Sequence, residues 1–291
     1  MFDGFSRGRV QAGDIVTCRV DLAMMHDSGG PRRVDSKLRE IGVGIWDPER
    51  VVVVSDHYVP AVDAESAEIL AFTRGWVAER GIRHFYDMRG ICHVVLQEYG
   101  HLQPGMFAVG GDSHSPSGGA YGSFMIGIGA TEMAGVLATG EIWVRVPGTR
   151  RVELKGALAA GVAAKDVMLH LCATLGMDND YQVVEYAGDG VSALSMRERL
   201  VLCNMAAELG AKTGIVAPDA RTLEALHAAG KTEVTLDPYW CSDADARLLG
   251  RVDVDAASLA PQVAAPHSPA NSAAVGQHAG VRIDQAYIGA C

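Results

Sequence analysis

The sequence predicts an α/β fold with mainly parallel sheets. Short apolar runs rich in β-branched residues alternate with longer segments of helical periodicity, as in β–α–β units. The clearest strand is Val51–Val54, four consecutive valines between polar turns, which is typical of a strand buried on both faces. The clearest helix is Ala64–Arg80, which ends before Gly81. In such a fold, ligands are expected beyond the carboxyl ends of the strands.

The other elements follow in chain order. Short strands are predicted near His84–Tyr86 and at Met106–Val109, and the second of these leads into a glycine-rich run. A second α/β unit is expected after Val146-Pro147-Gly148. Its predicted elements are strands at Val152–Leu154 and Gln182–Glu185, helices at Ala164–Leu175 and Ser195–Gly210, and a turn at Asp189-Gly190.

The last part of the chain differs in composition. Pro261–Asn271 is rich in proline and is interpreted as a connector, and Ile283–Cys291 is predicted to begin another strand. We therefore expect a first domain at 1–147, a second domain at 148–258, and a connector with the start of an incomplete third domain at 259–291.

Bulk composition excludes several classes of protein. With 291 residues, 48% hydrophobic and 21% charged, the chain has an ordinary globular composition. A net charge of −10 disfavours nucleic acid and anionic membranes as partners. No apolar run reaches the roughly 18 residues of a membrane span, and the N-terminus lacks a signal-peptide core, so a cytoplasmic protein is expected. Six scattered cysteines without Cys-x-x-Cys spacing are expected to be free thiols, with metal or cluster ligation possible for a minority.

The glycine-rich run Gly110–Glu132 carries the strongest functional signal. It places a carboxylate, a hydroxyl and an imidazole together as Asp112-Ser113-His114, directly after a predicted strand. The run contains no lysine, unlike a phosphate-binding loop. Ser113 is not framed as Gly-x-Ser-x-Gly, which disfavours a nucleophilic serine. The run is therefore interpreted as a site for a small polar substrate.

Asp56-His57 also follows a predicted strand. A carboxylate beside an imidazole can raise the pKa of the histidine and make it a proton donor near neutral pH. The alternative is a surface aspartate beside a helix-capping histidine. His93 lies in an apolar context, where a hydrogen-bonded core histidine is the alternative to a functional one. His26 follows a short apolar stretch and is equally compatible with a ligand-binding and a core position.

Asn204 and Glu208 are four residues apart in a predicted helix, so they are expected on one helical face. The alternative for Glu208 is an exposed residue that only aids solubility.

Seven segments in order resemble the aconitase superfamily, specifically the large subunit of two-subunit isopropylmalate dehydratases and homoaconitases. They are DLAMMHD, WDPERVVVVSDHYVPA, GICHVVLQE, GGDSHSPSGGAYGSFMIGIGATE, NMAAELGAKTG, PQVAAPHSPAN and IDQAYIGAC. The resemblance implies three-layer α/β/α domains. It also implies a [4Fe–4S] cluster and a hydro-lyase that dehydrates and rehydrates a branched hydroxy-dicarboxylic acid such as 3-isopropylmalate or a homocitrate-like acid.

The resemblance also implies roles for the acid–base residues. By position, Asp56 and His57 resemble the pair that protonates the departing hydroxyl, with Asp112 as the partner of His57. His93 and His114 resemble supporting imidazoles, each paired with a carboxylate, and Glu208 resembles the partner of His114.

Further positions match the substrate and cluster regions. Ser113 is similar to a serine that hydrogen-bonds a substrate carboxylate, and His26 is a second candidate substrate-binding residue. Asn204 resembles an asparagine near the cluster, and Cys291 aligns with the first cluster ligand. Ala290 stands where serine is usual, and the Cys-x-x-Cys pair that supplies the other two thiolates is missing. The catalytic base of these enzymes belongs to a separate small swivel-domain subunit, so this chain alone is expected to be inactive.

Two rival functions remain open at this stage. One is a non-catalytic scaffold or regulatory binding protein, although the acidic charge counts against RNA. The other is a mononuclear metal hydrolase that uses His57, His93, His114 and Asp112, although their spacing is not that of a tight zinc site.

Overall fold

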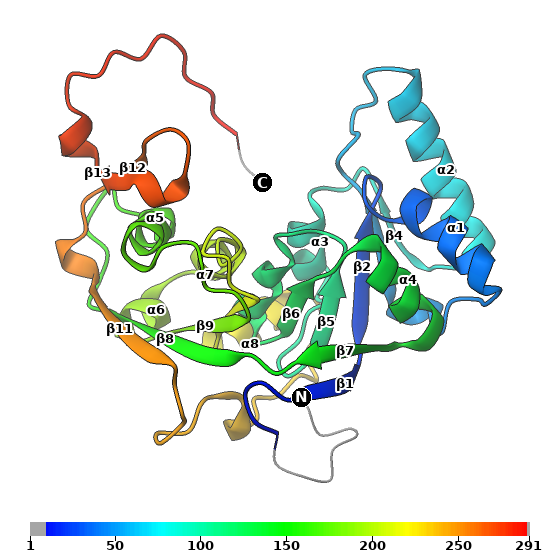
Figure 1. Ribbon diagram of the computed structural model, residues 1–291, viewed down its shortest axis with the longest axis horizontal. Helices are drawn as coiled ribbons and strands as arrows, with labels where there is room; N and C mark the ends of the chain where they lie inside the picture. Colours follow the sequence, from blue (N-terminus) through cyan, green and yellow to red (C-terminus); the bar gives the residue numbers. More distant parts are fainter. Residues whose placement is uncertain (1–9, 290–291) are drawn as a thin grey trace.

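The computed structural model describes residues 10–289 and places two parallel sheets side by side (Figure 1). The strand order in the first sheet is β4-β3-β2-β5-β6, and every neighbouring pair is parallel. Its strands are β2 (Leu22–His26), β3 (Val51–Ser55), β4 (His84–Asp87), β5 (Phe107–Gly110) and β6 (Phe124–Gly127). The predicted α/β class with mainly parallel sheets is confirmed.

The second sheet is also parallel, with the order β10-β9-β8-β11. Its strands are β8 (Gly148–Lys155), β9 (Gln182–Ala187), β10 (Thr213–Val216) and β11 (Gly250–Asp255). Two antiparallel pairs complete the strands: β1 (Ile15–Arg19) with β7 (Glu141–Arg145), and β12 (Gln262–Ala264) with β13 (Ser272–Ala274). Since β7 runs almost directly into β8, one continuous stretch links the two sheets (Figure 1).

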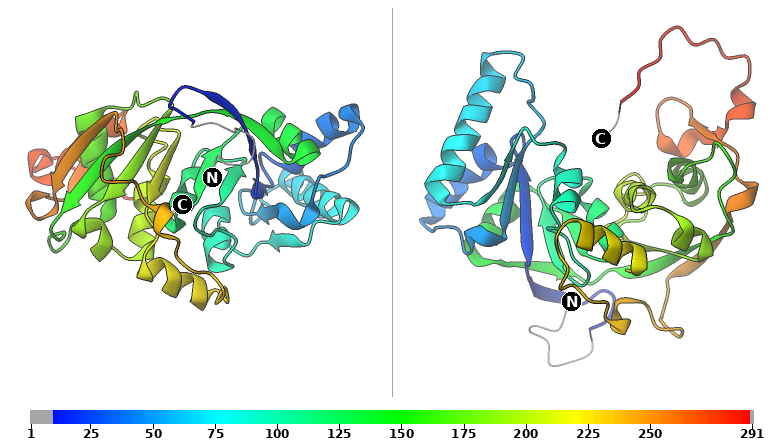
Figure 2. Two further views of the ribbon diagram at one scale, coloured as in Figure 1. Left: turned by 90° about the horizontal axis from the view of Figure 1, so that it is seen from below. Right: turned by 180° about the vertical axis from the view of Figure 1, so that it is seen from behind.

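Helices cover both sheets. In the views of Figure 2, the blue-to-cyan helices α1 and α2 lie on the side of the first sheet away from the second sheet. The helices are α1 (Pro31–Ile41), α2 (Ala64–Arg80), α3 (Cys92–Glu98), α4 (Ala130–Thr139), α5 (Ala164–Leu175), α6 (Asp189–Ala193), α7 (Met196–Asn204) and α8 (Ala220–Ala228). Short 3₁₀ turns are η1 (Pro48–Arg50), η2 (Ser115–Tyr121), η3 (Pro238–Trp240), η4 (Ala256–Ser258), η5 (Pro269–Asn271) and η6 (Val275–His278). Within residues 10–289, no helix combines the length and apolar character needed to cross a bilayer.

The alternation of side chains along the first sheet explains how two cores form. Along β2, Met24 packs into a core that is continuous with the second sheet, whereas Ala23 and Met25 pack on the outer side under α1 and α4. Val52 and Val54 on β3 likewise pack into the shared core, whereas Val51 and Val53 pack into the core on the other face of the sheet. Because both faces are buried, the strand reads as an unbroken apolar run.

The glycine-rich run supplies the contact between the sheets. Its η2 turn packs against β10 and α7 of the second unit. At Gly119 a Cβ atom would lie 1.8 Å from the Gly214 carbonyl oxygen, so only a hydrogen fits there. Glycine is required at this position because one backbone meets another.

Several predicted elements differ from the structure. The helix predicted at Ser195–Gly210 ends at Asn204, since residues 205–210 form successive tight turns through i→i−3 hydrogen bonds. Asp189-Gly190 begins α6 rather than forming only a turn. The connector Pro261–Asn271 contains β12, which packs on α5.

The strand predicted at Ile283–Cys291 is also wrong for residues 283–289. Ile283–Gly289 is exposed and forms no strand, because no described strand lies alongside it to pair with. Ala290 and Cys291 lie outside the described residues. The division into three domains stays a prediction.

Candidate active site

Three neighbouring strands bring the predicted polar residues to one edge of the first sheet. His26 ends β2, Asp56-His57 directly follows β3, and Asp112 lies just beyond β5. Because β3, β2 and β5 are adjacent and parallel, their carboxyl ends open at the same edge. The sheet order therefore brings together segments separated by about 30 to 85 residues in sequence.

Asp56 and His57 form the pair with the clearest acid–base character. His57 Nδ1 lies 2.6 Å from Asp56 Oδ1, and Asp56 Oδ2 accepts the Cys92 backbone N–H at 2.7 Å. The hydrogen bond to Asp56 raises the pKa of His57 and outweighs the opposite effect of partial burial. Since Nδ1 is engaged, Nε2 is free to exchange a proton, and 39% of the His57 side chain is exposed to reach a ligand.

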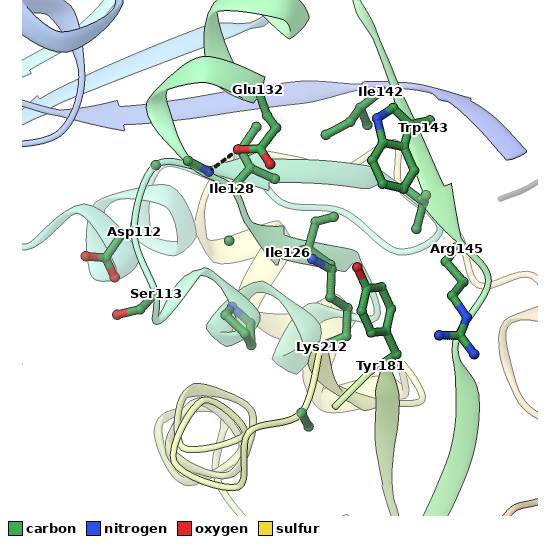
Figure 3. Close-up of a pocket in the computed structure, with 16 residues that line it drawn as sticks. Asp112, Ser113, Ile126, Ile128, Glu132, Ile142, Trp143, Arg145, Tyr181 and Lys212 are labelled. Atoms are coloured by element: carbon green, nitrogen blue, oxygen red, sulfur yellow. Dashed lines mark hydrogen bonds between the residues drawn. The ribbon is translucent and has the colours of Figure 1, made fainter. Parts of the chain in front are cut away.

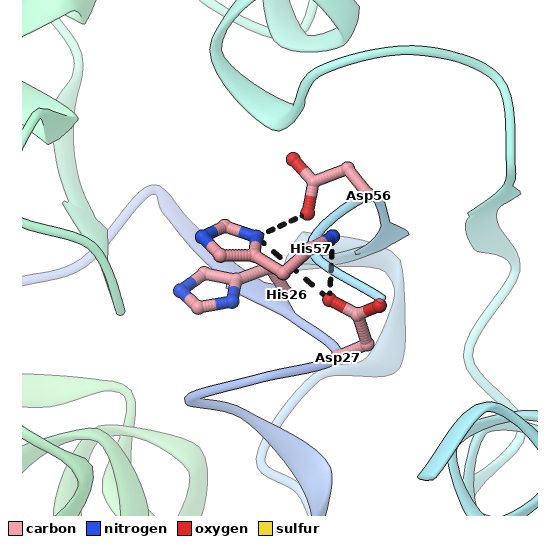
Figure 4. Close-up of side chains that lie close together, drawn as sticks. All are labelled: His26, Asp27, Asp56 and His57. Carbon is pink, nitrogen blue, oxygen red and sulfur yellow. Dashed lines mark hydrogen bonds and ion pairs between the residues drawn. The ribbon is translucent and has the colours of Figure 1, made fainter. Parts of the chain in front are cut away.

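His26 lies flat against His57 (Figure 4). The ring centroids are 3.9 Å apart and the planes differ by 14°. His26 Nε2 donates to the Gly111 carbonyl oxygen at 3.0 Å, and Nδ1 accepts the Gly29 N–H at 3.3 Å. Burial and the nearby His57 lower the pKa of His26. His26 is therefore the neutral ring of the stack, and its role in substrate binding stays a prediction.

Asp27 lies beside these residues, although the sequence patterns did not single it out. The side chain is completely buried, and its carboxylate accepts backbone N–H groups from Ser28, His57 and Tyr58 at 3.0–3.1 Å. These bonds join the loop after β2 to the loop after β3 and hold the His57 backbone in place. A signal was present, because Asp27 directly follows β2 as Asp56 directly follows β3.

Asp112 forms its side-chain hydrogen bond with His93 rather than with His57. Asp112 Oδ1 accepts His93 Nε2–H at 2.9 Å and the His114 backbone N–H at 2.7 Å. Its approach to His57 is a longer contact, 3.9 Å between Oδ2 and Nε2, whereas Asp56 binds the other nitrogen of that ring at 2.6 Å. Burial raises the pKa of Asp112, but the hydrogen bond from His93 and the other donors hold it well below its usual range. Asp112 is therefore hydrogen-bonded to His93, and its predicted partnership with His57 is present only as this longer contact.

His114 and Glu208 link the two units of the structure. His114 Nε2 lies 2.9 Å from Glu208 Oε1, which confirms the expected contact. This hydrogen bond raises the pKa of His114, and Ser113 Oγ lies 3.2 Å from His114 Nδ1. Glu208 comes from the tight turns after α7 rather than from a helical face shared with Asn204. Asn204 is the last residue of α7, and its predicted place near a cluster stays a prediction.

One group of side chains has atoms close enough to hold a metal ion: His26, Asp27, Asp56 and His57, whose ligand atoms lie within 4.8 Å of one another. The predicted alternative set of His57, His93, His114 and Asp112 forms no such group among residues 10–289. Within the group that does form, both carboxylates and both His26 nitrogens are already hydrogen-bonded. A metal ion would have to break these bonds, so the arrangement suits proton handling better.

The described cysteines do not form a ligand set for an iron–sulfur cluster. Cys18, Cys92, Cys172 and Cys203 are buried, and Cys241 is exposed. Burial raises the pKa of Cys92 and Cys203, and raises that of Cys172 to about 11. No cysteine belongs to the metal-compatible group found in the described part of the chain. Cys291, the predicted ligand, lies outside the described residues.

Comparison with known proteins agrees with this geometry. The pattern of the Aconitase family (aconitate hydratase) matches residues 6–287. The chain is 48% identical to the 3-isopropylmalate dehydratase large subunit 1 of Methanopyrus kandleri, over 97% of this chain and 67% of the relative. It is 46% identical to the probable 3-isopropylmalate dehydratase large subunit of Methanothermobacter thermautotrophicus, over 98% and 68%. It is 41% identical to the probable methanogen homoaconitase large subunit of the same organism, over 97% and 67%.

These matches extend along nearly the whole chain and include all the segments that form the acid–base cluster. The chain spans about two thirds of the length of these relatives. It belongs to the aconitase family of hydro-lyases.

Proposed function

We propose that this chain is the large-subunit part of a hydro-lyase that dehydrates and rehydrates a branched hydroxy-dicarboxylic acid, such as 3-isopropylmalate or a homocitrate-like acid. The observation that carries the proposal is the convergence of three imidazole–carboxylate pairs at one edge: His57–Asp56, His93–Asp112 and His114–Glu208. The names of the similar proteins support this substrate class.

The chemistry requires a proton for the departing hydroxyl group. Dehydration removes that hydroxyl and a neighbouring C–H proton as water and leaves an alkene diacid. His57 Nε2–H donates the proton, and Asp56 stabilises the imidazolium form that carries it. In the reverse direction, neutral Nε2 accepts a proton from the entering water. The neutral His26 ring stacks on His57 and holds the plane of that ring.

The other pairs supply binding and charge balance. Asp112 stays ionised between His93 and the His114 backbone, which holds the glycine-rich loop in one conformation. The Ser113 hydroxyl, at the exposed end of that loop, is placed to donate to a substrate carboxylate. These residues form one wall of the proposed site.

The remaining parts of the site come from outside residues 10–289. We propose that the cofactor is a [4Fe–4S] cluster. Cys291 would be one of its ligands, and further polypeptide would supply the other two thiolates. When bound, such a cluster supplies a Lewis acid for the substrate hydroxyl and carboxylate. A small swivel-domain subunit supplies the base, as the large-subunit names of the relatives suggest. The chain alone is therefore expected to be inactive.

Reconstitution tests the proposal. The longest open reading frame containing this sequence is combined anaerobically with its small subunit, iron and sulfide. 3-Isopropylmalate and homocitrate are then supplied in separate assays. We expect visible absorbance from an iron–sulfur cluster and formation of an alkene diacid from one of the two substrates. If the complex forms no cluster but is active with Zn²⁺, the mononuclear metal alternative replaces our proposal. A cluster-free and inactive complex would favour the scaffold function.

The pH profile of the reconstituted enzyme tests the role of Asp56. His57 donates in its protonated form, so activity is present below its pKa and is lost as pH rises through it. Asp56 raises that pKa above the usual value of about 6.5. Asp56→Asn removes the carboxylate charge and should move the alkaline limb of kcat/KM to lower pH. Asp253→Asn, on the exposed face of β11, should leave the limb in place. An unmoved limb in Asp56→Asn would mean that another group donates the proton.

A further inference from the structure

A cavity of about 460 Å³ lies beside the loop that carries Asp112 and Ser113 (Figure 3). Cavities that bind small molecules typically measure about 300–1,000 Å³. In Figure 3 the Asp112 carboxylate and the Ser113 hydroxyl lie at one edge and point away from Tyr181 and Arg145 at the opposite edge. The cavity therefore shares the Asp112–Ser113 loop with the acid–base cluster, and Tyr181 and Arg145 lie at its far edge.

Two cations meet at one aromatic ring in this cavity. The Arg145 guanidinium carbon lies 5.3 Å and Lys212 Nζ lies 5.8 Å from the centroid of the Tyr181 ring. Neither cation forms an ion pair with any residue in the described part of the chain. Burial lowers the pKa of Lys212 and the charge of Glu132 offsets this only in part, so its ammonium group would gain from a further anionic partner. Two unpaired cations at one wall favour an anion there.

The cationic wall is held in place before any ligand arrives. The Asn179 side chain donates to the Leu209 carbonyl at 2.9 Å, and the Lys212 backbone N–H donates to the Gln182 carbonyl at 2.8 Å. These bonds join the loop of Tyr181 to the loop of Lys212. Tyr181 itself has a left-handed backbone, with φ of 55°, which is costly for a bulky residue. Such strain persists where the surroundings impose it, and it is concentrated at binding sites.

The rest of the lining sets the shape and polarity of a ligand. Ile126, Ile142 and Trp143 form an apolar wall, and 61% of the Trp143 side chain is exposed towards solvent. The Glu132 carboxylate, which also lines the cavity, already accepts the Gly129 N–H at 2.8 Å. The lining therefore combines an unpaired cationic end with an apolar surface.

We propose that this cavity binds a small carboxylate with a branched apolar body, as a second site beside the acid–base cluster. The carboxylate binds beside Lys212, with Arg145 on the other side of the Tyr181 ring, and the apolar body packs against Ile126, Ile142 and Trp143. This site goes beyond the proposed dehydration, since none of these five side chains belongs to the imidazole–carboxylate pairs.

The probe for the test is 4-methylpentanoate, titrated into the full-length chain in complex with its small subunit. We expect saturable binding by calorimetry and a matching change in tryptophan fluorescence that Trp143→Phe removes. The neutral analogue 4-methylpentanamide should bind at least about tenfold more weakly, as should 4-methylpentanoate to Lys212→Met. Lys212→Arg keeps the charge and should stay within about threefold of the natural protein. This rescue separates loss of the cation from loss of the fold.

Three results would overturn the proposal. The first is the absence of saturable binding at millimolar probe. The second is equal affinity for acid and amide, or unchanged affinity in Lys212→Met, because the cations would then play no part. The third is loss of binding in His57→Gln, which would place the probe in the acid–base cluster instead. We expect His57→Gln to bind 4-methylpentanoate as the natural protein does.

Discussion

Replacing His57 by glutamine should lower kcat for dehydration by at least about 100-fold, the lower end of what a general acid contributes. The glutamine amide can keep a hydrogen bond to Asp56, but it has no proton to give to a departing hydroxyl. Since 39% of the His57 side chain is exposed and Nε2 is free, we expect the fold and the cluster absorbance to be unchanged. The measurement is alkene formation by the reconstituted two-subunit enzyme, with the visible spectrum of the same sample.

His227→Gln is the matched control. His227 is exposed near the end of α8 and has no place in the acid–base cluster, so its replacement should leave kcat unchanged. If His57→Gln keeps more than about a tenth of the natural rate, another group must protonate the hydroxyl. Loss of the cluster spectrum together with activity would instead give His57 a structural role.

The second large effect concerns stability. Gly119→Ala would place a methyl group 1.8 Å from the Gly214 carbonyl oxygen and 3.1 Å from the Ile215 Cα atom. All these atoms are backbone, so no side-chain rotation can relieve the overlap. We expect the free energy of unfolding to fall by about 3 kcal/mol or more, at the upper end of overpacking effects. Chemical denaturation of the chain measures this change.

Gly135→Ala gives the comparison for this substitution. Gly135 lies inside α4, and a Cβ atom there would meet nothing within 4 Å. Because alanine favours helix more than glycine, this variant should gain up to about 1 kcal/mol. If Gly119→Ala is as stable as the natural chain, the two sheets do not meet at η2 as described.

Local sequence patterns were sufficient for many of the elements. The helix Ala64–Arg80 was predicted from its periodicity and from Gly81, which takes the left-handed conformation at its end, and the structure shows that Asp63 caps its first turn. The helix after Ser195 was predicted too long, because Gly210 appeared to be its natural end. There the chain instead tightens into turns that carry Glu208 to His114, a contact between residues 94 positions apart.

In the candidate site, too, local sequence patterns predicted some residues, whereas others depended on contacts between distant segments. Strand-end positions and the glycine-rich run were enough to select Asp56, His57, Asp112 and His114. The partners of the histidines were harder to predict, because Asp56 binds Nδ1 of His57 while Asp112 only approaches Nε2 of that ring and hydrogen-bonds His93. The only sequence signal for Asp27 is its position at the end of a strand, because one sequence does not distinguish a completely buried aspartate from an exposed one.

By itself, the sequence determined the parallel α/β class, most strand and helix positions, and the family, since periodicity, capping residues and motifs are local properties of the chain. Only the tertiary structure decided that Asp112 binds His93, that Gly119 must lack a side chain, and that Arg145, Tyr181 and Lys212 share one cavity. Each of these depends on the order of strands in a sheet or on the contact between two sheets. Such contacts join residues distant in sequence, and their geometry is set only when both units pack against the shared core.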